Sequence, residues 1–183
     1  EAFTSRTPGS LGHFGYCLTN DAGYKNKCYM QALPNNGTIN RSNVNYIALS
    51  TELRYSVAFP VMATAPARKT YYVWVRGLGC SNVDKSVHAG LNMNSTLSAN
   101  SDDMTGWVGC SYIWSRQWIN YNNPCPCPSG DSYIQVQWDD GSDGAFENIS
   151  LWMREDGMHV DRVILTSDVN YNPNNDPGFA DGY

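Results

Sequence analysis

Apolar and polar residues alternate along several short stretches of the chain, a pattern typical of β-strands with one buried face. The clearest alternation covers residues 53–59, and it ends near Pro60, which cannot donate a hydrogen bond within a sheet. Further strands are predicted at residues 71–76, 86–91, 110–114 and 133–138. No segment has a convincing helical period, so the pattern predicts an all-β protein.

The stretch from residue 149 to residue 166 contains the two most distinctive predicted strands. Residues 149–153 alternate between apolar and polar, and the second strand has an apolar, β-branched run made up of Val160, Val163, Ile164 and Leu165. Between them lies the sequence Arg-Glu-Asp-Gly, residues 154–157, whose glycine can adopt the positive φ of a tight turn. This pattern predicts a β-hairpin that carries three charges at the end of a sheet, where β-sandwiches often carry binding loops.

Turn-forming residues separate the predicted strands. Residues 1–44 are predicted to be mostly turns, residues 64–70 a loop, and residues 92–106 a polar surface loop. The Pro-Cys-Pro-Cys-Pro run within residues 120–130 cannot pair in a sheet. About eight strands remain, which predicts one domain, an antiparallel β-sandwich over residues 1–167.

Residues 168–183 are predicted to form an extended C-terminal tail. Pro173 and Pro177 exclude a helix or a central strand, and the segment has few apolar groups to offset the cost of ordering. Alone it is therefore expected to be disordered. Its apolar and aromatic side chains are nevertheless spaced as in a segment that docks across a neighbouring domain: Val169, Tyr171, Phe179 and Tyr183.

The composition is typical of an extracellular all-β domain with polar loops. The 183 residues include 6 Trp and 12 Tyr, and charged residues are few. The net charge of -5, without a cluster of Lys and Arg, argues against a nucleic-acid partner. No apolar run approaches the roughly 20 residues of a membrane span. The first residue is Glu1 rather than Met, which indicates a mature or trimmed chain.

Six cysteines, an even number, favour disulfides and, together with the sequons described below, a secreted protein. Cys17 and Cys28 bracket a short, turn-rich loop and are predicted to bridge. A bridge within the Cys-Pro-Cys sequence would be strained. The remaining four cysteines are therefore predicted to form two bridges, in an order that the sequence leaves open, between Cys125 and Cys127 on one side and Cys80 and Cys110 on the other.

Four N-x-S/T sequons support the same extracellular location, because N-glycans are added along the eukaryotic-type secretory route. They start at Asn36, Asn40, Asn94 and Asn148. The first three lie in predicted polar loops and are predicted to carry glycans. Asn148 lies on a predicted strand, on the face opposite Ile149 and Leu151, and is the less certain acceptor.

Five motifs carry a family resemblance. In chain order they are MQALPNNGT (30–38), YVWVRG (72–77), SVHAGLN (86–92), LWMREDG (151–157) and VDRVILT (160–166). Together they resemble the non-catalytic β-sandwich modules of the galactose-binding-like superfold, close to carbohydrate-binding module families 6 and 35. The resemblance covers roughly residues 1–170, and it implies a jelly-roll sandwich more specifically than it implies a ligand.

The resemblance also implies a structural calcium ion, held between an opening glutamate and an aspartate on the last strand. Glu1 and Asp161 match these positions, whereas Phe3 departs from the Glu-Ala-Glu opening that such modules often have. Calcium takes at least six oxygen ligands, so two carboxylates need further donors. The alternative is that Asp161 pairs with Arg162 or Arg154, or caps a backbone group.

Two other groups of possible metal ligands have ordinary explanations. The acidic sequence at residues 139–144 fails the EF-hand pattern, since a glycine occupies one ligand position and Ser150 stands where the bidentate glutamate belongs. It is predicted to be a solvated turn. His13, His88 and His159 lack metal-ligand spacing and are predicted to lie at the surface or to form hydrogen bonds.

The candidate ligand-binding residues are aromatic and planar polar side chains in or beside predicted loops, because sugars bind to flat apolar faces flanked by hydrogen-bonding groups. A tryptophan in such a loop can instead simply cover one end of the sandwich. Trp74, Trp138 and Trp152 lie on predicted strands and are expected in the core. The candidates are Trp107, Trp114, Trp118, Arg154, Glu155 and Asp156.

Catalysis has the least support. Glu155 and Asp156 are adjacent, so in a turn they cannot lie on both sides of a glycosidic bond as paired catalytic carboxylates do. The sequence has no nucleophile elbow, phosphate-binding loop or HExxH pattern.

The first hypothesis is therefore a secreted, non-catalytic domain that binds an extracellular glycan or polysaccharide. The alternative is a glycosylated structural subunit of an extracellular fibre or matrix, self-assembled through its C-terminal tail.

Overall fold

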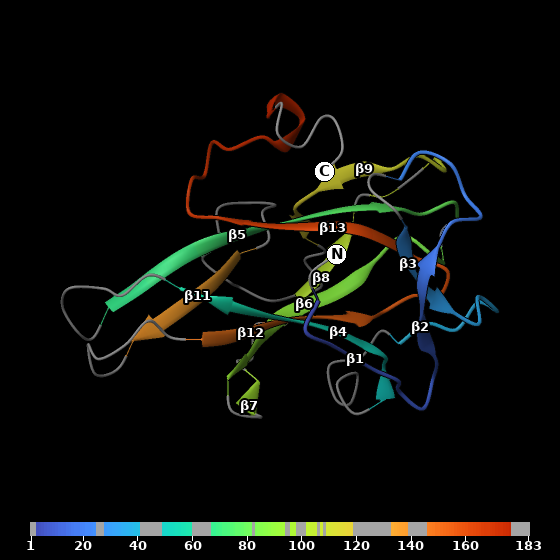
Figure 1. Ribbon diagram of the computed structural model, residues 1–183, viewed down its shortest axis with the longest axis horizontal. Helices are drawn as coiled ribbons and strands as arrows, with labels where there is room; N and C mark the ends of the chain where they lie inside the picture. The colour runs from blue at the N-terminus through green and yellow to red at the C-terminus, as the bar shows by residue number, and fades with distance from the viewer. Residues whose placement is uncertain are drawn as a thin grey trace.

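Thirteen β-strands and one short 3-10 helix make up the part of the chain that the computed structural model describes (Figure 1). That part comprises residues 3–24, 28–40, 49–59, 67–81, 83–93, 96–97, 102–105, 107, 109–118, 133–138 and 146–176. The strands are β1 (Ser5–Thr7), β2 (His13–Leu18), β3 (Tyr29–Leu33), β4 (Glu52–Ala58), β5 (Ala67–Leu78), β6 (Val87–Met93), β7 (Thr96–Leu97), β8 (Asp102–Thr105), β9 (Ile113–Ser115), β10 (Gln117–Trp118), β11 (Tyr133–Trp138), β12 (Phe146–Met153) and β13 (His159–Thr166). The helix η1 covers Pro173–Asn175.

The strands form two antiparallel sheets. The first sheet has the order β1-β4-β12-β6-β8-β10, with β7 paired to β6. The second sheet has the order β11-β5-β13-β3-β2, with β9 paired to β5. The predicted all-β, antiparallel sandwich is thus confirmed, with more and shorter strands than the eight expected from the pattern.

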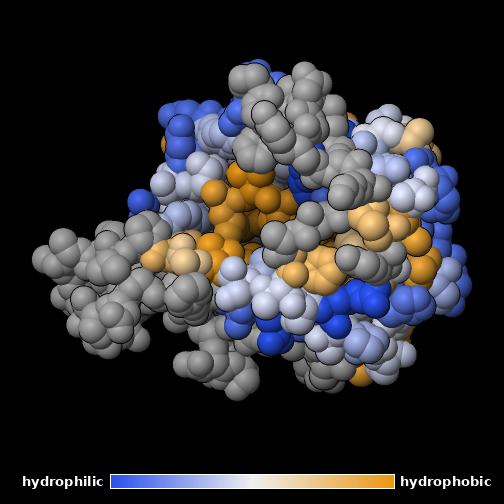
Figure 2. Space-filling model, viewed as in Figure 1, coloured by the Kyte–Doolittle hydropathy of each residue, from blue (hydrophilic) through white to orange (hydrophobic). Residues whose placement is uncertain are grey.

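The core lies between the inner faces of the two sheets. The first sheet contributes Leu53 from β4 and Ile149 and Leu151 from β12, and the second contributes Val73 and Val75 from β5. These are alternate residues of their strands, as the apolar pattern predicts. Figure 2 shows apolar surface near the middle of the viewed face, with polar surface to its left and below it.

The hairpin predicted between residues 149 and 166 is wrong. β12 and β13 lie in different sheets: β12 pairs with β4 and β6, whereas β13 pairs with β5 and β3. Residues 154–158 therefore cross from one sheet to the other. Both strands are central in their sheets, which explains why both are so apolar. Gly157 does have the expected positive φ, of 86°, and a Cβ there would collide with the side chain of Asn35.

Three predicted loops contain strands. Residues 1–44 include β1, β2 and β3, and residues 92–106 include the end of β6, β7 and β8. β5 begins at residue 67, inside the predicted loop at 64–70. Met104 on β8 is fully buried in the core although its neighbours in the sequence are polar. These strands are short or carry few apolar residues, so the apolar pattern does not reveal them.

The segment after β13 runs above β5 and β13 in the view of Figure 1. Its helix η1 begins after Asn172, whose side chain accepts a hydrogen bond from the backbone of Asn174. The expectation that the prolines exclude a helix here is therefore wrong for this single 3-10 turn, because proline fits the first turn of a helix. Arg116 Nη1 donates to the carbonyl of Val169 at 2.8 Å, which ties this segment to the domain. Residues 177–183 lie outside the described part, so the boundary at residue 167 stays a prediction. Within the described residues, no helix has the length and apolar character needed to cross a membrane.

Candidate functional site

A group of aromatic rings lies on the outer face of the second sheet. Met30 on β3 and Val160 on β13 are paired across the two strands and point into the core. Because side chains alternate along a strand, their neighbours Tyr29 and His159 lie on the opposite, outer face. Strand pairing therefore places a tyrosine and a histidine together that are far apart in the sequence.

Four rings form this group, which we call the tyrosine–histidine cluster: Tyr24, Tyr29, Tyr112 and His159. The His159 ring is stacked on Tyr29, with centroids 4.4 Å apart and an interplanar angle of 18°. The Tyr112 hydroxyl is hydrogen-bonded to His159 Nδ1 at 3.0 Å. The Tyr24 ring lies 5.5 Å from Tyr29 and 6.5 Å from Tyr112, centroid to centroid. Tyr29 and His159 are buried, whereas Tyr24 and Tyr112 are half-buried and form the accessible part of the cluster.

An ion pair supports the cluster from the sheet. Arg76 on β5 pairs through Nη1 with Asp161 Oδ2 on β13, and both side chains are buried. The same guanidinium lies 5.2 Å from the centroid of the Tyr112 ring and donates from Nη2 to the carbonyl of Gly23 at 2.9 Å. Arg76 thereby holds the two loops that carry Tyr24 and Tyr112. The sequence suggests Arg162 or Arg154 as the partner of Asp161, whereas the ion pair described in the structure is with Arg76.

Both described disulfides lie beside the cluster. Cys17 and Cys28 bridge, as predicted, with Cα atoms 4.6 Å apart. They close the loop that carries Asp21 and Tyr24. The loop also positions Asn20, whose Oδ1 accepts a hydrogen bond from the Tyr29 hydroxyl at 2.6 Å. The Cys17–Cys28 disulfide therefore holds in place the loop that lies on one side of the cluster.

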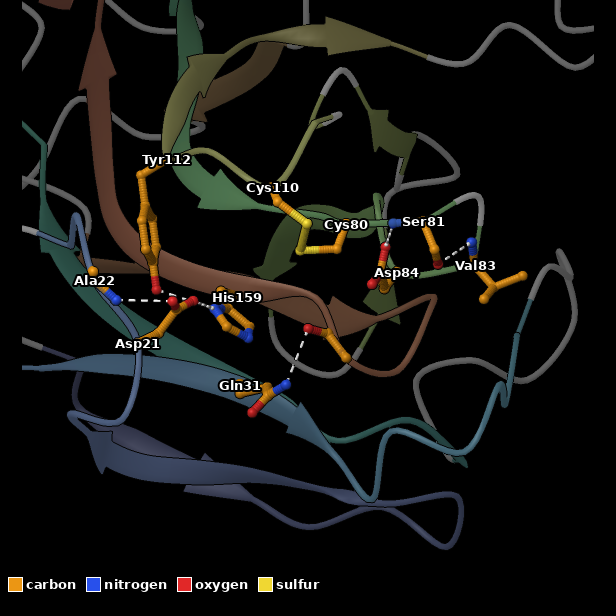
Figure 3. Close-up of a disulfide and its surroundings, with 11 residues drawn as sticks. Asp21, Ala22, Gln31, Cys80, Ser81, Val83, Asp84, Cys110, Tyr112 and His159 are labelled. Atoms are coloured by element: carbon orange, nitrogen blue, oxygen red, sulfur yellow. Dashed lines mark hydrogen bonds and ion pairs between the residues drawn. A yellow bond between two sulfur atoms is a disulfide. The ribbon is translucent and has the colours of Figure 1, made fainter.

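The second bridge corrects the sequence-based prediction. Cys80 and Cys110 pair with each other, not with Cys125 or Cys127. β9 returns along β5, and the backbone N–H of Cys110 donates to the carbonyl of Gly79 at 3.2 Å, so the two cysteines are brought together. Cys125 and Cys127 lie outside the described residues. Figure 3 shows Tyr112 two residues beyond this bridge, with Tyr112 and Asp21 both directed at His159.

The charge on His159 depends on two opposing neighbours of its Nδ1 atom. Asp21 Oδ2 lies 3.3 Å away and favours the protonated ring, whereas a hydrogen bond donated by the Tyr112 hydroxyl requires a neutral ring. Burial outweighs the carboxylate and lowers the pKa of His159, while Asp21 and Asp84 act in the opposite direction. Burial also raises the pKa of Tyr29 and of Tyr112, with Asp21 adding to both shifts. Burial thus favours the neutral forms of Tyr29, Tyr112 and His159.

This arrangement predicts that the domain loses stability in mild acid. The pKa of His159 is lower in the folded chain than in the unfolded chain, so the unfolded state binds more protons near the ordinary histidine pKa of about 6.5. The free energy of unfolding should therefore fall as the pH drops below that value. Urea denaturation between pH 8 and pH 5 measures it, and His159→Gln should show a smaller loss. An equal loss in both proteins would assign the pH dependence to other groups.

Arg154, Glu155 and Asp156, predicted as ligand-binding residues, lie in the crossover between the sheets, and all three are buried. Arg154 Nη1 donates to Glu155 Oε1 at 2.9 Å and to Ser86 Oγ at 2.7 Å. Glu155 Oε2 accepts the backbone N–H of Lys85 at 2.8 Å. These hydrogen bonds therefore connect the crossover to the segment that precedes β6.

Asp156 joins the crossover to a second loop. Its side chain has an exposed fraction of 0%, and its two oxygens accept the backbone N–H groups of Asn36, at 2.6 Å, and of Gly37, at 3.1 Å. The backbone N–H of Asp156 donates in return to the carbonyl of Thr38 at 3.0 Å. A carboxylate held in this way stabilises a turn and is not exposed to a ligand.

The three candidate tryptophans have different environments. Trp107 is fully buried in the core, and its Nε1 donates to the carbonyl of Ile113 at 3.2 Å. Trp114 on β9 is half-buried and lies opposite Arg76 of β5, so it shares the outer face with the cluster. Trp118 lies on β10, opposite Met104, and its side chain is outside the described part.

The sequons also differ in their surroundings. Asn36 is exposed. Asn40 is only 8% exposed, and its Nδ2, the atom that would carry a glycan, donates to Ser50 Oγ at 2.9 Å. The structure therefore argues against a glycan at Asn40, because the residue is built into the fold. Asn148 is half-buried on β12, and Asn94 lies outside the described residues.

The residues around Asp161 do not fit the calcium site that the sequence resemblance implies. The Asp161 carboxylate is paired with a guanidinium, which supplies the positive charge that calcium would bring. Among the described residues, no three His, Cys, Asp or Glu side chains are placed to hold a metal ion together. Glu1, the other predicted ligand, lies outside the described part.

Sequence reasoning missed Asp21, Tyr24, Tyr29 and Tyr112, and assigned His159 only a surface or hydrogen-bonding role. One signal was available: Asp21 and Tyr24 lie inside a cysteine-bracketed loop, and Tyr112 follows another cysteine by two residues. Disulfide-closed loops are rigid, and rigid loops on a sandwich are common positions for binding residues.

Comparison with known proteins finds one curated relative and several structural ones. No family model matches the chain. The chain is 28% identical over 153 residues to an uncharacterized protein of Formosa agariphila. The match covers 81% of this chain and 34% of the relative, so the chain spans about a third of the relative's length.

Among solved structures, the chain is similar to part of the isomalto-dextranase of Arthrobacter globiformis T6 complexed with panose, with a TM-score of 0.50 and 11% identity over 90% of this chain and 23% of the enzyme. A β-(1,4)-mannanase of Podospora anserina with a family 35 carbohydrate-binding module gives a TM-score of 0.48 at 15% identity, covering 94% of this chain and 29% of that one. A family 35 module of Clostridium thermocellum gives 0.47 at 14% identity, covering 90% and 100%. The likeness to the isomalto-dextranase supports the sandwich fold.

Proposed function

We propose that this domain binds carbohydrate without catalysing a reaction, and that the tyrosine–histidine cluster is its binding site. The observation that carries the proposal is the pairing of two half-exposed tyrosine rings, Tyr24 and Tyr112, with an accessible carboxylate, Asp21, whose side chain is 37% exposed. Aromatic faces bind the apolar C–H patches of a sugar ring, and planar polar groups bind its hydroxyls. Two disulfides hold the loops that present these groups, which reduces the ordering cost of binding.

The ligand class rests on the sequence motifs and on the fold. The motifs resemble non-catalytic carbohydrate-binding modules, and the isomalto-dextranase that shares the fold was solved with panose. For this chain we propose only the class of ligand, an oligosaccharide or polysaccharide.

The absence of catalysis is supported by how the charged groups at the site are used. Asp161, the carboxylate under the cluster, is ion-paired with Arg76, and a paired, buried carboxylate is a poor acid or base. His159 is stacked on one tyrosine and hydrogen-bonded to another through Nδ1. These contacts describe a rigid surface for binding.

Glycan arrays and affinity gels with immobilised polysaccharides test this proposal. We expect binding by the wild type, and a loss of at least about tenfold in affinity for Tyr112→Ala and for Tyr24→Ala, since each removes one ring from the binding surface. Ile113→Ala is the matched control, because Ile113 is 38% exposed beside Tyr112 and lies outside the cluster. Each protein is tested with calcium and with a chelator. Failure to bind any glycan in either condition, or equal binding by all variants, contradicts the proposal.

An extracellular location and N-glycosylation belong to the same proposal. Two disulfides are consistent with folding in an oxidising compartment. In a host that adds N-glycans, Asn36→Gln should remove the mass of one glycan, whereas Asn40→Gln should remove none because Asn40 is buried. Intact-mass measurement compares the two variants. A wild type with the mass of the bare polypeptide would contradict the glycosylation.

One observation favours the alternative of a self-assembling fibre subunit: Val169 in the C-terminal segment is an exposed large apolar residue. Sedimentation velocity of the full chain and of a chain ending at Ser167 tests it. Assembly that is lost on truncation would support the fibre reading, and a monomer in both cases would contradict it.

A further inference from the structure

We propose that Asn36 is a self-modification site, at which the backbone nitrogen of Gly37 attacks the side-chain amide of Asn36 to form a succinimide. The reacting groups lie in the turn at residues 34–38, which packs against the crossover between the sheets. Asp156 of the crossover and Thr38 of the turn contact the nucleophile and the electrophile, respectively. The inference does not depend on the proposed carbohydrate binding, and it concerns chains in which Asn36 Nδ2 carries no glycan, because a glycan on that nitrogen would block the reaction.

The nucleophile lies next to a base, in an uncrowded turn. Gly37 has φ of 85°, and apart from Gly37 and its two chain neighbours no residue has an atom within 4 Å of the position that a Cβ would occupy. A backbone N–H is a very weak acid, so its deprotonation is the step that most needs assistance. The N–H of Gly37 donates to Asp156 Oδ1 at 3.1 Å, and this buried carboxylate is placed to accept the proton.

The electrophile is polarised by the same turn. Thr38 Oγ1 donates a hydrogen bond to Asn36 Oδ1 at 2.6 Å. Negative charge develops on this oxygen when the amide carbon becomes tetrahedral, and a donor already in place stabilises that charge. Asn36 is exposed, so water can reach the product.

The reaction balances without an added reagent other than water. The bond between Gly37 N and Asn36 Cγ forms, and the bond between Asn36 Cγ and Nδ2 breaks. The proton taken by Asp156 is passed to the leaving nitrogen, which departs as ammonia. Water then opens the cyclic imide at either carbonyl and leaves aspartate or isoaspartate at position 36.

The product would weaken the contact between the turn and the crossover. Asn36 donates its backbone N–H to Asp156 Oδ2 at 2.6 Å, and a new carboxylate at position 36 places a second negative charge near the first. Isoaspartate additionally lengthens the backbone by one atom, which shifts the two N–H groups away from Asp156. The modification therefore adds a negative charge to the turn and weakens its two hydrogen bonds to Asp156.

Peptide mapping by mass spectrometry tests this inference on full-length protein made in a host without N-glycosylation and incubated at neutral pH. A passive Asn-Gly sequence reacts more slowly in a folded chain, whereas a catalysed one reacts faster. We expect conversion at position 36 to be at least about tenfold faster in the folded protein than in the same chain in urea, and Asp156→Asn to slow it by at least about tenfold. Slower or equal conversion in the folded protein overturns the proposal.

A second variant covers the case in which Asp156→Asn does not fold. Thr38→Val removes the hydroxyl that polarises the Asn36 amide and leaves Asp156 in place. We expect its folded form to convert several-fold more slowly than the wild type, and circular dichroism verifies that it is folded. Wild-type rates in folded Thr38→Val would overturn the proposed geometry.

Discussion

Replacing Trp107 with alanine should lower the free energy of unfolding by about 3–5 kcal/mol, the usual cost of removing a large aromatic side chain from a core. Trp107 is fully buried and packs against Gly77, where a Cβ would lie 3.2 Å from its Nε1. The variant also leaves the carbonyl of Ile113 without the indole N–H that it accepts. Urea denaturation followed by circular dichroism measures the loss.

Trp114→Ala is the matched control for this prediction. Trp114 is another candidate tryptophan from the same region, but it is half-buried on the outer face of the second sheet. Its removal should cost no more than about 2 kcal/mol, because less apolar surface is returned to water. A Trp107→Ala protein as stable as the wild type would contradict the placement of Trp107 in the core and restore it as a ligand-binding candidate.

The second large effect is expected for Asp156→Ala, at about 3 kcal/mol of unfolding free energy. The substitution leaves two backbone N–H groups, of Asn36 and Gly37, without their acceptor, and hydrogen bonds to a charged group are the stronger kind. Asp168→Ala is the matched control, since Asp168 also accepts a backbone N–H, from Asn170, but is exposed. The control should cost less than about 1 kcal/mol. Equal losses of unfolding free energy in the two variants would contradict the stabilising role of the buried Asp156 carboxylate.

The sequence pattern was sufficient for the strands whose apolar residues alternate. The predicted strand at residues 133–138 coincides with β11, and the alternation at residues 53–59 gives β4 with Leu53 in the core. Alternation shows which face of a strand is buried, but it does not show which strand is the neighbour. For this reason the pattern predicts a hairpin from β12 to β13, although the two strands lie in opposite sheets.

The charged turn shows why site prediction was harder than fold prediction. Arg154, Glu155 and Asp156 have the composition of an exposed binding loop. In the structure their charges are satisfied by each other, by the hydroxyl of Ser86, and by backbone N–H groups of segments 70 to 120 residues away in the sequence. Burying a charge is favourable only with such partners, and no local pattern reveals partners that distant.

The tyrosine–histidine cluster is hidden for the same reason. Its rings come from the loop after β2, the start of β3, the loop before β9 and the start of β13. The pairing of β3 with β13, the two disulfides and Arg76 bring them together. The sequence can indicate each tyrosine as a candidate binding residue, but it does not show that these tyrosines lie together in the folded chain.

The central claim is that sugar binds at this cluster, and NMR chemical-shift mapping of the isotope-labelled protein during titration with an oligosaccharide tests it most directly. The oligosaccharide is a fragment of whichever glycan gives the strongest signal on the array. The account predicts that the largest shifts fall on Asp21, Tyr24, Tyr112 and the imidazole of His159, and that Tyr112→Ala abolishes them. Saturable binding with its largest shifts elsewhere, or no shift at any residue with any glycan, would contradict it.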